Sequence, residues 1–176
     1  MNIFKKTIAC IFFAAAGTLA FAQLPARYDI ITINSDSNNE KGIYDMPNNA
    51  SGRYVLSLGH MGFGDEDVQI NLDPISELFI PLGNTVDEAL AKLLEIQEMY
   101  KSEPESVFET TGCLGIGVPN GDLQKIKIRF RKIFLTRQLE FILVQNDATR
   151  ATFIQRSDFN SLVSGFKFHK KLHPND

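Results

Sequence analysis

The order of the elements that the sequence predicts indicates an α+β fold. Short segments rich in β-forming residues come first, a long amphipathic helix follows, and a run of consecutive strand patterns leads into a second helix. Alternating strand and helix units, which predict a parallel sheet, do not occur. We therefore expect an antiparallel β-sheet, a meander in the carboxy-terminal half, with two α-helices packed on one face.

The first 22 residues have the pattern of an export signal. Lys5 and Lys6 precede a short apolar run, and Ala20-Phe21-Ala22 supplies the small residues that signal peptidase requires. We predict a signal peptide over residues 1–22, cleaved before Gln23. The protein is then expected to be periplasmic or extracellular, with no transmembrane segment after cleavage. An uncleaved amino-terminal anchor is the alternative.

The remaining chain divides into an extension and one domain. Residues 23–52 combine a β-rich segment at 27–33 with a stretch over 34–52 that is dense in Asn, Ser, Asp and Gly. Such a stretch contains too little apolar surface to order itself, so we predict a long loop there. A single α+β domain is expected over residues 53–176, because the chain that remains after cleavage is long enough for one domain with its own hydrophobic core.

In the first half of that domain, alternation predicts strands and helical spacing predicts a helix. The strand patterns occupy residues 53–59, 67–72 and 77–83. Thr85 and Glu88 form a T-x-x-E capping box before a run of apolar residues at helical spacing, which predicts a helix over 85–100. Pro104 follows the end of this helix and cannot continue it.

In the second half, strand patterns follow one another with no helix between them. They occupy residues 107–111, 114–118, 124–135, 138–145 and 150–156. Phe134 belongs to the third of these and is expected in the core with the other apolar residues of the meander. A helix with Ser157 as its N-cap ends the chain.

The most regular chemical pattern is a row of cations in "KIKIRFRKIF", residues 125–134. It consists of Lys125, Lys127, Arg129 and Arg131, with apolar residues between them. A strand with one wet face shows this alternation without any binding role. A row of unpaired cations on an acidic protein also attracts anions, so the row is a candidate binding surface.

The pairing of the next strand decides which of these cations are unpaired. A turn at Thr136-Arg137 places Ile142 opposite Arg131 and Glu140 diagonal to it. The other end of the row has no carboxylate across from it in this pairing. The candidate binding residues are therefore Lys125, Lys127 and Arg129, for a partner such as an anionic glycan or an envelope protein.

Catalysis has weaker support in the sequence, because no complete catalytic, metal-binding or phosphate-binding motif is present. Cys113 lies inside a β-like stretch and is expected to be a buried, inert thiol. His169 and His173 are four residues apart but lack further ligands, so we assign no metal site and no cofactor. A small hydrolase whose fold brings Cys113 and His60 together is the alternative to a non-catalytic binding domain.

The charge of the protein argues against one class of partner. The formal net charge is −3, and it becomes more negative when the two lysines of the signal leave. A net acidic domain is not suited to nucleic acid, whose phosphates attract basic surfaces.

Overall fold

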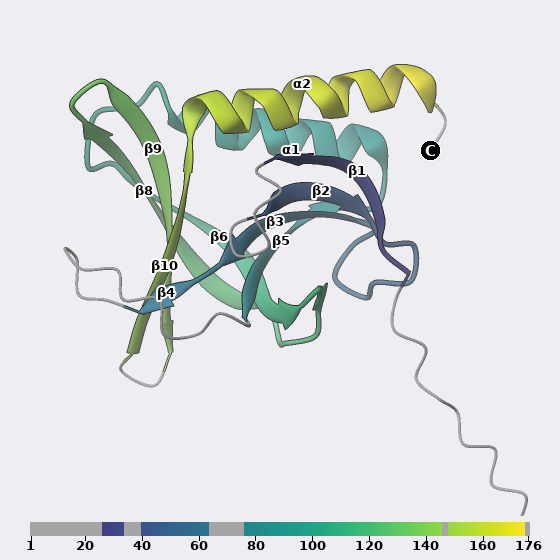
Figure 1. Cartoon of the computed structure of the whole chain (residues 1–176), viewed down its shortest axis with the longest axis horizontal. Helices are drawn as coiled ribbons and strands as arrows, with labels where there is room; N and C mark the ends of the chain where they lie inside the picture. Colours follow the sequence, from purple (N-terminus) through teal and green to yellow (C-terminus); the bar gives the residue numbers. More distant parts are fainter. Residues whose placement is uncertain (1–25, 34–39, 64–75, 146–147, 175–176) are drawn as a thin grey trace, which may run out of the picture.

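A strongly curved antiparallel sheet carries two helices that lie side by side along one side of it in Figure 1. This computed structural model describes residues 26–33, 40–63, 76–145 and 148–174. The strands are β1 (Tyr28–Ile33), β2 (Lys41–Asp45), β3 (Tyr54–His60), β4 (Gly62–Phe63), β5 (Glu77–Gly83), β6 (Val107–Ile116), β7 (Val118–Pro119), β8 (Gln124–Ile133), β9 (Thr136–Gln145) and β10 (Ala148–Gln155). The helices are α1 (Val86–Met99) and α2 (Arg156–Leu172). The predicted α+β class is confirmed.

The strand order of the 10-stranded sheet is β1-β2-β3-β5-β6-β8-β9-β10-β4, with β7 paired to β6. Each of these pairs is antiparallel. From β6 onward the strands follow chain order apart from the short β7, so the predicted meander in the second half is confirmed. The predicted strand over residues 67–72 lies outside the described residues.

The sheet curls back on itself because β3 and β4 are consecutive in the chain but pair with different neighbours. β3 lies between β2 and β5, whereas β4 pairs with β10 through Gly62 and Phe63. The hydroxyl of Thr152 on β10 also donates to the carbonyl of Leu58 on β3, at 3.1 Å. These contacts connect the two halves of the sheet, and the main core lies where the curved sheet meets the helices.

The main core combines side chains from both helices and from the strands of both halves of the sheet. Tyr100, directly after α1, is packed at the centre: its ring lies 6.3 Å from that of Phe130 and 5.9 Å from that of Phe159. Its hydroxyl donates to the carbonyl of Ile154 at 2.9 Å, which satisfies a buried polar group. Burial raises the pKa of Tyr100, so this phenol stays protonated.

A smaller core lies on the opposite face of the first half of the sheet. It contains Tyr44, Met46, Val55, Phe79 and Cys113. Successive side chains on a strand point to opposite faces, so Val55 enters this core while its neighbours in β3 enter the main one. The first half of the sheet is therefore covered on both faces.

The long loop predicted over residues 34–52 is wrong for Lys41–Asp45, which form β2. Ile43, Tyr44 and Met46 are fully buried, and β2 pairs with both β1 and β3. The average composition of the stretch is polar, but these apolar side chains have neighbouring strands that cover them. Partners distant in the sequence thus order a segment that its composition assigns to a loop.

Both helices begin near the predicted positions. At α1 the Thr85 hydroxyl accepts from the Glu88 N–H at 3.2 Å and the Glu88 carboxylate accepts from the Thr85 N–H, so the capping box is confirmed. At α2 the prediction of Ser157 as N-cap is wrong, because the helix begins at Arg156 after Gln155. The last strand leads directly into this helix. Within the described residues, no helix is long and apolar enough to cross a membrane.

A glycine sets how closely α2 approaches the first strand. A Cβ atom at Gly165 would lie 2.1 Å from the Cδ1 atom of Ile31, a distance that real side chains do not adopt. The missing side chain allows β1 to pack beneath the helix. Lys170 and Asp87 form an ion pair between the two helices, and the Gln97 amide donates to Asn160 at 2.7 Å.

Candidate binding surface on the β8–β9 hairpin

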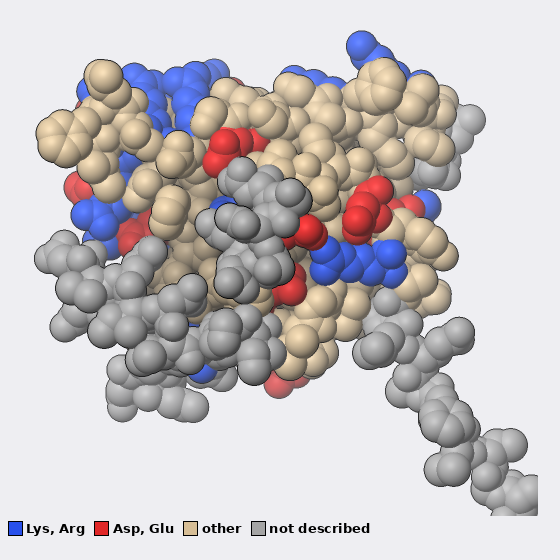
Figure 2. Space-filling view, viewed as in Figure 1, with Lys and Arg blue, Asp and Glu red and all other residues tan. Residues whose placement is uncertain are grey.

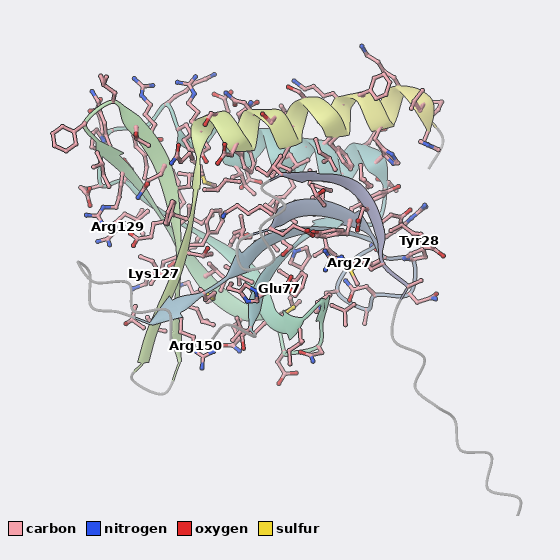
Figure 3. The ribbon with its side chains drawn as sticks, in the orientation of Figure 1. Arg27, Tyr28, Glu77, Lys127, Arg129 and Arg150 are labelled. Atoms are coloured by element: carbon pink, nitrogen blue, oxygen red, sulfur yellow. The ribbon has the colours of Figure 1, made fainter. Side chains whose placement is uncertain are left out.

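The strand that carries the cation row has one buried and one exposed face, as its alternation predicts. Ile126, Ile128 and Phe130 are at most 2% exposed, while Lys125 and Lys127 on the other face are exposed. Figure 3 shows Lys127 and Arg129 on the outer side of the hairpin that β8 forms with β9, well separated from Arg27 and Glu77. The row therefore lies on the outer surface.

The predicted pairing of β8 with β9 is wrong, because the turn lies two residues earlier in the chain than Thr136-Arg137. Phe134 and Leu135 form the turn, so Arg129 lies opposite Glu140 and Arg131 opposite Gln138. With a turn at Thr136-Arg137, Lys132 would lie opposite Phe141, on the face that enters the core. The observed register pairs Ile128 with Phe141 and keeps Lys132 beyond the core.

Acidic neighbours contact two of the three candidate binding residues. Lys125 Nζ lies 2.7 Å from Glu109 of β6, and Arg129 Nη2 lies 2.7 Å from Glu140 of β9. The expectation that this end of the row lacks carboxylates is therefore wrong, because it took no account of β6 and used the shifted register. Lys127 makes no ion pair with any other described residue. The binding role of these residues remains a prediction.

The end of the hairpin exposes three consecutive apolar side chains. We call residues 131–137 the hairpin tip. Phe134 is 93% exposed, Leu135 98% and Ile133 42%. The expected place of Phe134 in the core is therefore wrong. Elsewhere in the described residues the exposed large apolar side chains occur singly along the chain, which is normal for protein surfaces.

The backbone of the tip adds a second unusual feature. Phe134 has a φ of 54°, in the left-handed region where glycine and asparagine are favoured over bulky residues. Two-residue hairpin turns use such conformations, and Gly or Asn normally occupies them. The sequence instead places an aromatic side chain there and exposes it to solvent.

Cations flank this apolar turn on both faces of the hairpin. Lys132 and Arg137 lie directly opposite each other on the face that continues from the buried Phe130, and Arg131 lies on the outer face. Neither Lys132 nor Arg137 contacts a carboxylate within the described residues. Like charges placed directly across a strand pair repel each other. Figure 2 shows Lys and Arg side chains gathered at the end of the molecule that carries this hairpin in Figure 1.

A contrasting cluster of charge surrounds Arg27, immediately before β1. Its guanidinium donates to the carbonyl of Gly117 at 2.7 Å and to Glu40 at 3.0 Å, and it lies over the ring of Tyr44. The carboxylates of Asp29 and Glu77 lie 3.7 and 3.9 Å from it. We call these residues the Arg27 cluster. It attaches the start of β1 to the β6–β7 turn.

Tyr44 and Glu77 connect the Arg27 cluster to the sheet. The Tyr44 hydroxyl donates to Glu40 at 2.8 Å, and the pKa of Tyr44 is raised by burial and by this hydrogen bond. Glu77 accepts from the hydroxyl of Ser57 at 3.1 Å and from the Gly117 N–H at 3.2 Å. Each of these groups has a partner within the cluster, which indicates a structural role.

The two candidate catalytic residues are not brought into contact. Cys113 on β6 is 1% exposed and lies opposite Phe79 of β5, whereas His60 on β3 lies opposite Glu77 of β5. With β5 between them, the two strands that carry Cys113 and His60 are about 10 Å apart, beyond hydrogen-bond reach. The Nδ1 atom of His60 is buried and has no hydrogen-bond partner in the described part of the chain.

The state of the thiol also argues against a nucleophile. Burial raises the pKa of Cys113, and the backbone N–H of Gly121 offsets this only in part. Because the thiolate is the reactive form, a raised pKa and a covered sulfur both slow its reactions. In residues 26–33, 40–63, 76–145 and 148–174, no group of three or more His, Cys, Asp or Glu side chains could hold a metal ion.

Sequence reasoning missed the hairpin tip, although one signal was available. Ile133, Phe134 and Leu135 are three apolar residues in a row, and an alternating strand can bury only one face. At least one of them therefore had to lie outside the core or in a turn. Which of them form the turn is decided by the register in which β8 pairs with β9.

The fold and this surface define an α+β protein whose most distinctive exposed feature, among the described residues, is an apolar hairpin tip flanked by cations. No family model matches the chain. Comparison with curated proteins and with solved structures likewise found no match.

Proposed function

We propose that the protein is an exported, non-catalytic binding domain that engages an anionic partner through the hairpin tip. The observation that carries this proposal is the combination of exposed Phe134 and Leu135 with Lys132 and Arg137, which have no acidic partner in the described residues. Exposed apolar groups beside unpaired cations contribute little to folding and suit contact with a partner.

Lys127 extends this surface along the outer face of the hairpin. It lies opposite Ile142 of β9 and Glu109 of β6 in the strand pairing, yet it forms no ion pair within the described residues. Lys125 and Arg129 of the original row are partly neutralised by Glu109 and Glu140. Of Lys125, Lys127 and Arg129, Lys127 is therefore the one whose charge is left for anion binding in this proposal.

Salt-dependent binding tests the proposal. The full chain should bind at least one polyanion from a panel of heparin, polyglutamate and phosphatidylglycerol vesicles, and binding should weaken as salt rises, because screening shortens the range of surface charges. Lys132→Gln/Arg137→Gln should lose most of this binding. Lys125→Gln is the matched control, since it removes a lysine that Glu109 already neutralises. Absence of binding to every probe, or equal loss with the control, would contradict the proposal.

Alkylation of Cys113 separates binding from thiol chemistry. The burial that raises the pKa of Cys113 should keep the thiol unreactive toward iodoacetamide at neutral pH in the native protein and make it reactive on unfolding. Mass spectrometry measures the extent of labelling. Rapid labelling of the native protein would instead favour the hydrolase alternative.

Export is the remaining part of the proposal, and it concerns residues outside the described ranges. The charged start, short apolar run and Ala20-Phe21-Ala22 support cleavage before Gln23. Mass spectrometry of the protein from its native host should find Gln23 as the amino terminus. A full-length chain in the membrane fraction would identify the first segment as an anchor.

A further inference from the structure

We infer that the anionic partner is the surface of a lipid bilayer, into which the hairpin tip inserts. This inference rests on the proposed function and specifies its ligand. Phe134 and Leu135 are the inserted groups, while Arg131, Lys132 and Arg137 meet the lipid headgroups.

The apolar part of the tip is a projecting turn, not a groove. Phe134 and Leu135 are both more than nine-tenths exposed, and Ile133 adds a partly exposed side chain beside them. A small convex apolar group has no concave surface in which to hold a ligand. It can remove its side chains from water by entering a soft apolar medium, such as the boundary between headgroups and acyl chains.

The distance of the cations from the apolar turn matches the depth to which interfacial segments insert into a bilayer. A strand rises about 3.3 Å per residue, so the backbone of Lys132 lies about 7 Å below that of Phe134 along the hairpin axis. Interfacial segments bury their apolar side chains about 5–10 Å into the boundary between headgroups and acyl chains. When Phe134 reaches that layer, Lys132 and Arg137 lie at the level of the lipid phosphates.

The arrangement of the cations indicates a planar partner. Arg131 lies on the outer face of the hairpin, and Lys132 with Arg137 lies on the inner face. Charges on both faces can contact a surface together only when the hairpin approaches it along its own axis. A bilayer presents headgroups all around the inserted turn. A soluble polyanion satisfies the cations but leaves the exposed apolar turn without a role.

The nearby carboxylates do not cancel this surface. Glu140 lies 3.8 Å from Arg131 and neutralises it in part, but it is 7% exposed and lies four strand positions from Thr136 at the turn. The N–H of Glu105 donates to the carbonyl of Phe130, which places its backbone below Lys132 on the hairpin. The net negative charge of the whole chain turns its acidic surfaces away from an anionic bilayer and directs the cationic tip toward it.

The conformation of Phe134 supports a functional reason for this residue. A glycine would adopt the positive φ with less strain, and a polar residue would reduce the exposed apolar area. Strained positions that bring no packing benefit are found preferentially at functional sites. Insertion into lipid gives the aromatic ring the apolar surroundings that it lacks in the free protein.

Tryptophan fluorescence offers a direct test, because the chain contains no tryptophan. Phe134→Trp places a single reporter at the tip, and Leu123→Trp places one at another exposed site, about 30 Å away at the opposite end of β8. With vesicles of equal parts phosphatidylglycerol and phosphatidylcholine, emission of the tip reporter should shift to shorter wavelength and be quenched by brominated acyl chains. The Leu123→Trp reporter should show neither change.

Variants measured by vesicle co-sedimentation separate the apolar from the charged contribution. Phe134→Ser/Leu135→Ser should weaken binding at least about 30-fold, because two large apolar side chains no longer leave water. Lys132→Gln/Arg137→Gln should weaken it about 20-fold at low salt and less at high salt. Lys125→Gln should remain within about twofold, since Glu109 neutralises this lysine. All variants share the same amino-terminal segment, so differences between them report the hairpin.

The outcomes distinguish this inference from the proposed function. Phosphatidylglycerol-dependent changes at Phe134→Trp, lost in the Gln double variant, support insertion into an anionic bilayer. Equal binding to pure phosphatidylcholine, or no change with any vesicle, would overturn it. Binding to heparin or polyglutamate without any vesicle response would overturn the lipid inference while leaving an anion-binding hairpin. A response of both tryptophan reporters would show that the contact is not confined to the hairpin tip. It would contradict the lipid inference and the proposed function alike.

Discussion

The Arg27 cluster and the hairpin tip are both rich in charge, but only the first balances it internally. Arg27 contacts carboxylates from three residues, a carbonyl and an aromatic ring, and the side chains that surround it also bond to one another. At the tip, Lys132 faces Arg137 across the hairpin with no carboxylate contact in the described residues. Internal balance indicates a role in holding the fold. Its absence, beside exposed apolar groups, is what supports the proposed contact with a partner.

The β8–β9 hairpin contains both balanced and unbalanced charge within a few residues. At its base, Arg129 and Glu140 form a short ion pair in which the side chains are 15% and 9% exposed. At its tip, Lys132 and Arg137 form no ion pair within the described residues, and the apolar side chains are exposed. The change from one to the other follows the edge of the core, because Phe130 and Leu139 are the last core pair on the strands.

Balanced charge should matter strongly where it is buried, as it is at Glu140, which is 7% exposed. Glu140→Ala leaves Arg129 without its close carboxylate in a poorly hydrated site, and we expect a loss of about 3 kcal/mol in the free energy of unfolding. Urea denaturation measures this loss. The double variant Arg129→Leu/Glu140→Leu should be more stable than Glu140→Ala, because the poorly hydrated charge of Arg129 is removed together with its partner. If Glu140→Ala unfolds like the wild type, the pair does not stabilise the hairpin.

The Arg27 cluster should show the next largest effect. Arg27→Met removes the hydrogen bonds to Gly117 and Glu40 and leaves neighbouring carboxylates without their cation, which should cost about 2 kcal/mol. Amide hydrogen exchange should increase first in β1, which the cluster attaches to the sheet. Arg27→Lys is the control that retains the charge but not the planar fork. Unchanged protection of the β1 amides from exchange would show that Arg27 does not hold β1 on the sheet.

At the hairpin tip, by contrast, a substitution should raise the free energy of unfolding. Phe134→Gly removes the strain of a bulky residue at positive φ, and we expect it to raise the free energy of unfolding by about 1 kcal/mol. The same change should abolish insertion into vesicles. A residue that lowers stability while enabling binding is the pattern expected of a functional site. Loss of stability in Phe134→Gly would mean that the ring contributes to the fold.

The smallest effects should differ in sign between paired and unpaired cations. Lys132→Gln relieves repulsion from Arg137 and should raise stability by about 0.3 kcal/mol. Lys125→Gln removes an exposed pair with Glu109 and should lower stability by a similar or smaller amount. Thermal unfolding of both variants at low salt, where surface charges act most strongly, measures the difference. Equal changes in stability of the same sign in both variants would contradict the distinction between the unpaired Lys132 and the paired Lys125.

Local sequence patterns determined most of the elements. The capping box of Thr85 and Glu88, the alternation of β8 and the succession of strands after α1 each depend on residues close together in the chain. The α+β class follows from their order. The burial of Cys113 was also accessible, because free cysteine behaves as a small apolar residue.

Tertiary structure alone decided the features that depend on partners distant in the sequence. Lys41–Asp45 became a strand because β1 and β3 cover its apolar residues, and Glu109 reached Lys125 because β6 pairs with β8. The register of β8 against β9 placed Glu140 beside Arg129 and Phe134 outside the core, since a turn at Thr136-Arg137 would bring Lys132 into it. Local alternation identifies the two faces of a strand, but only pairing shows which neighbour each face meets.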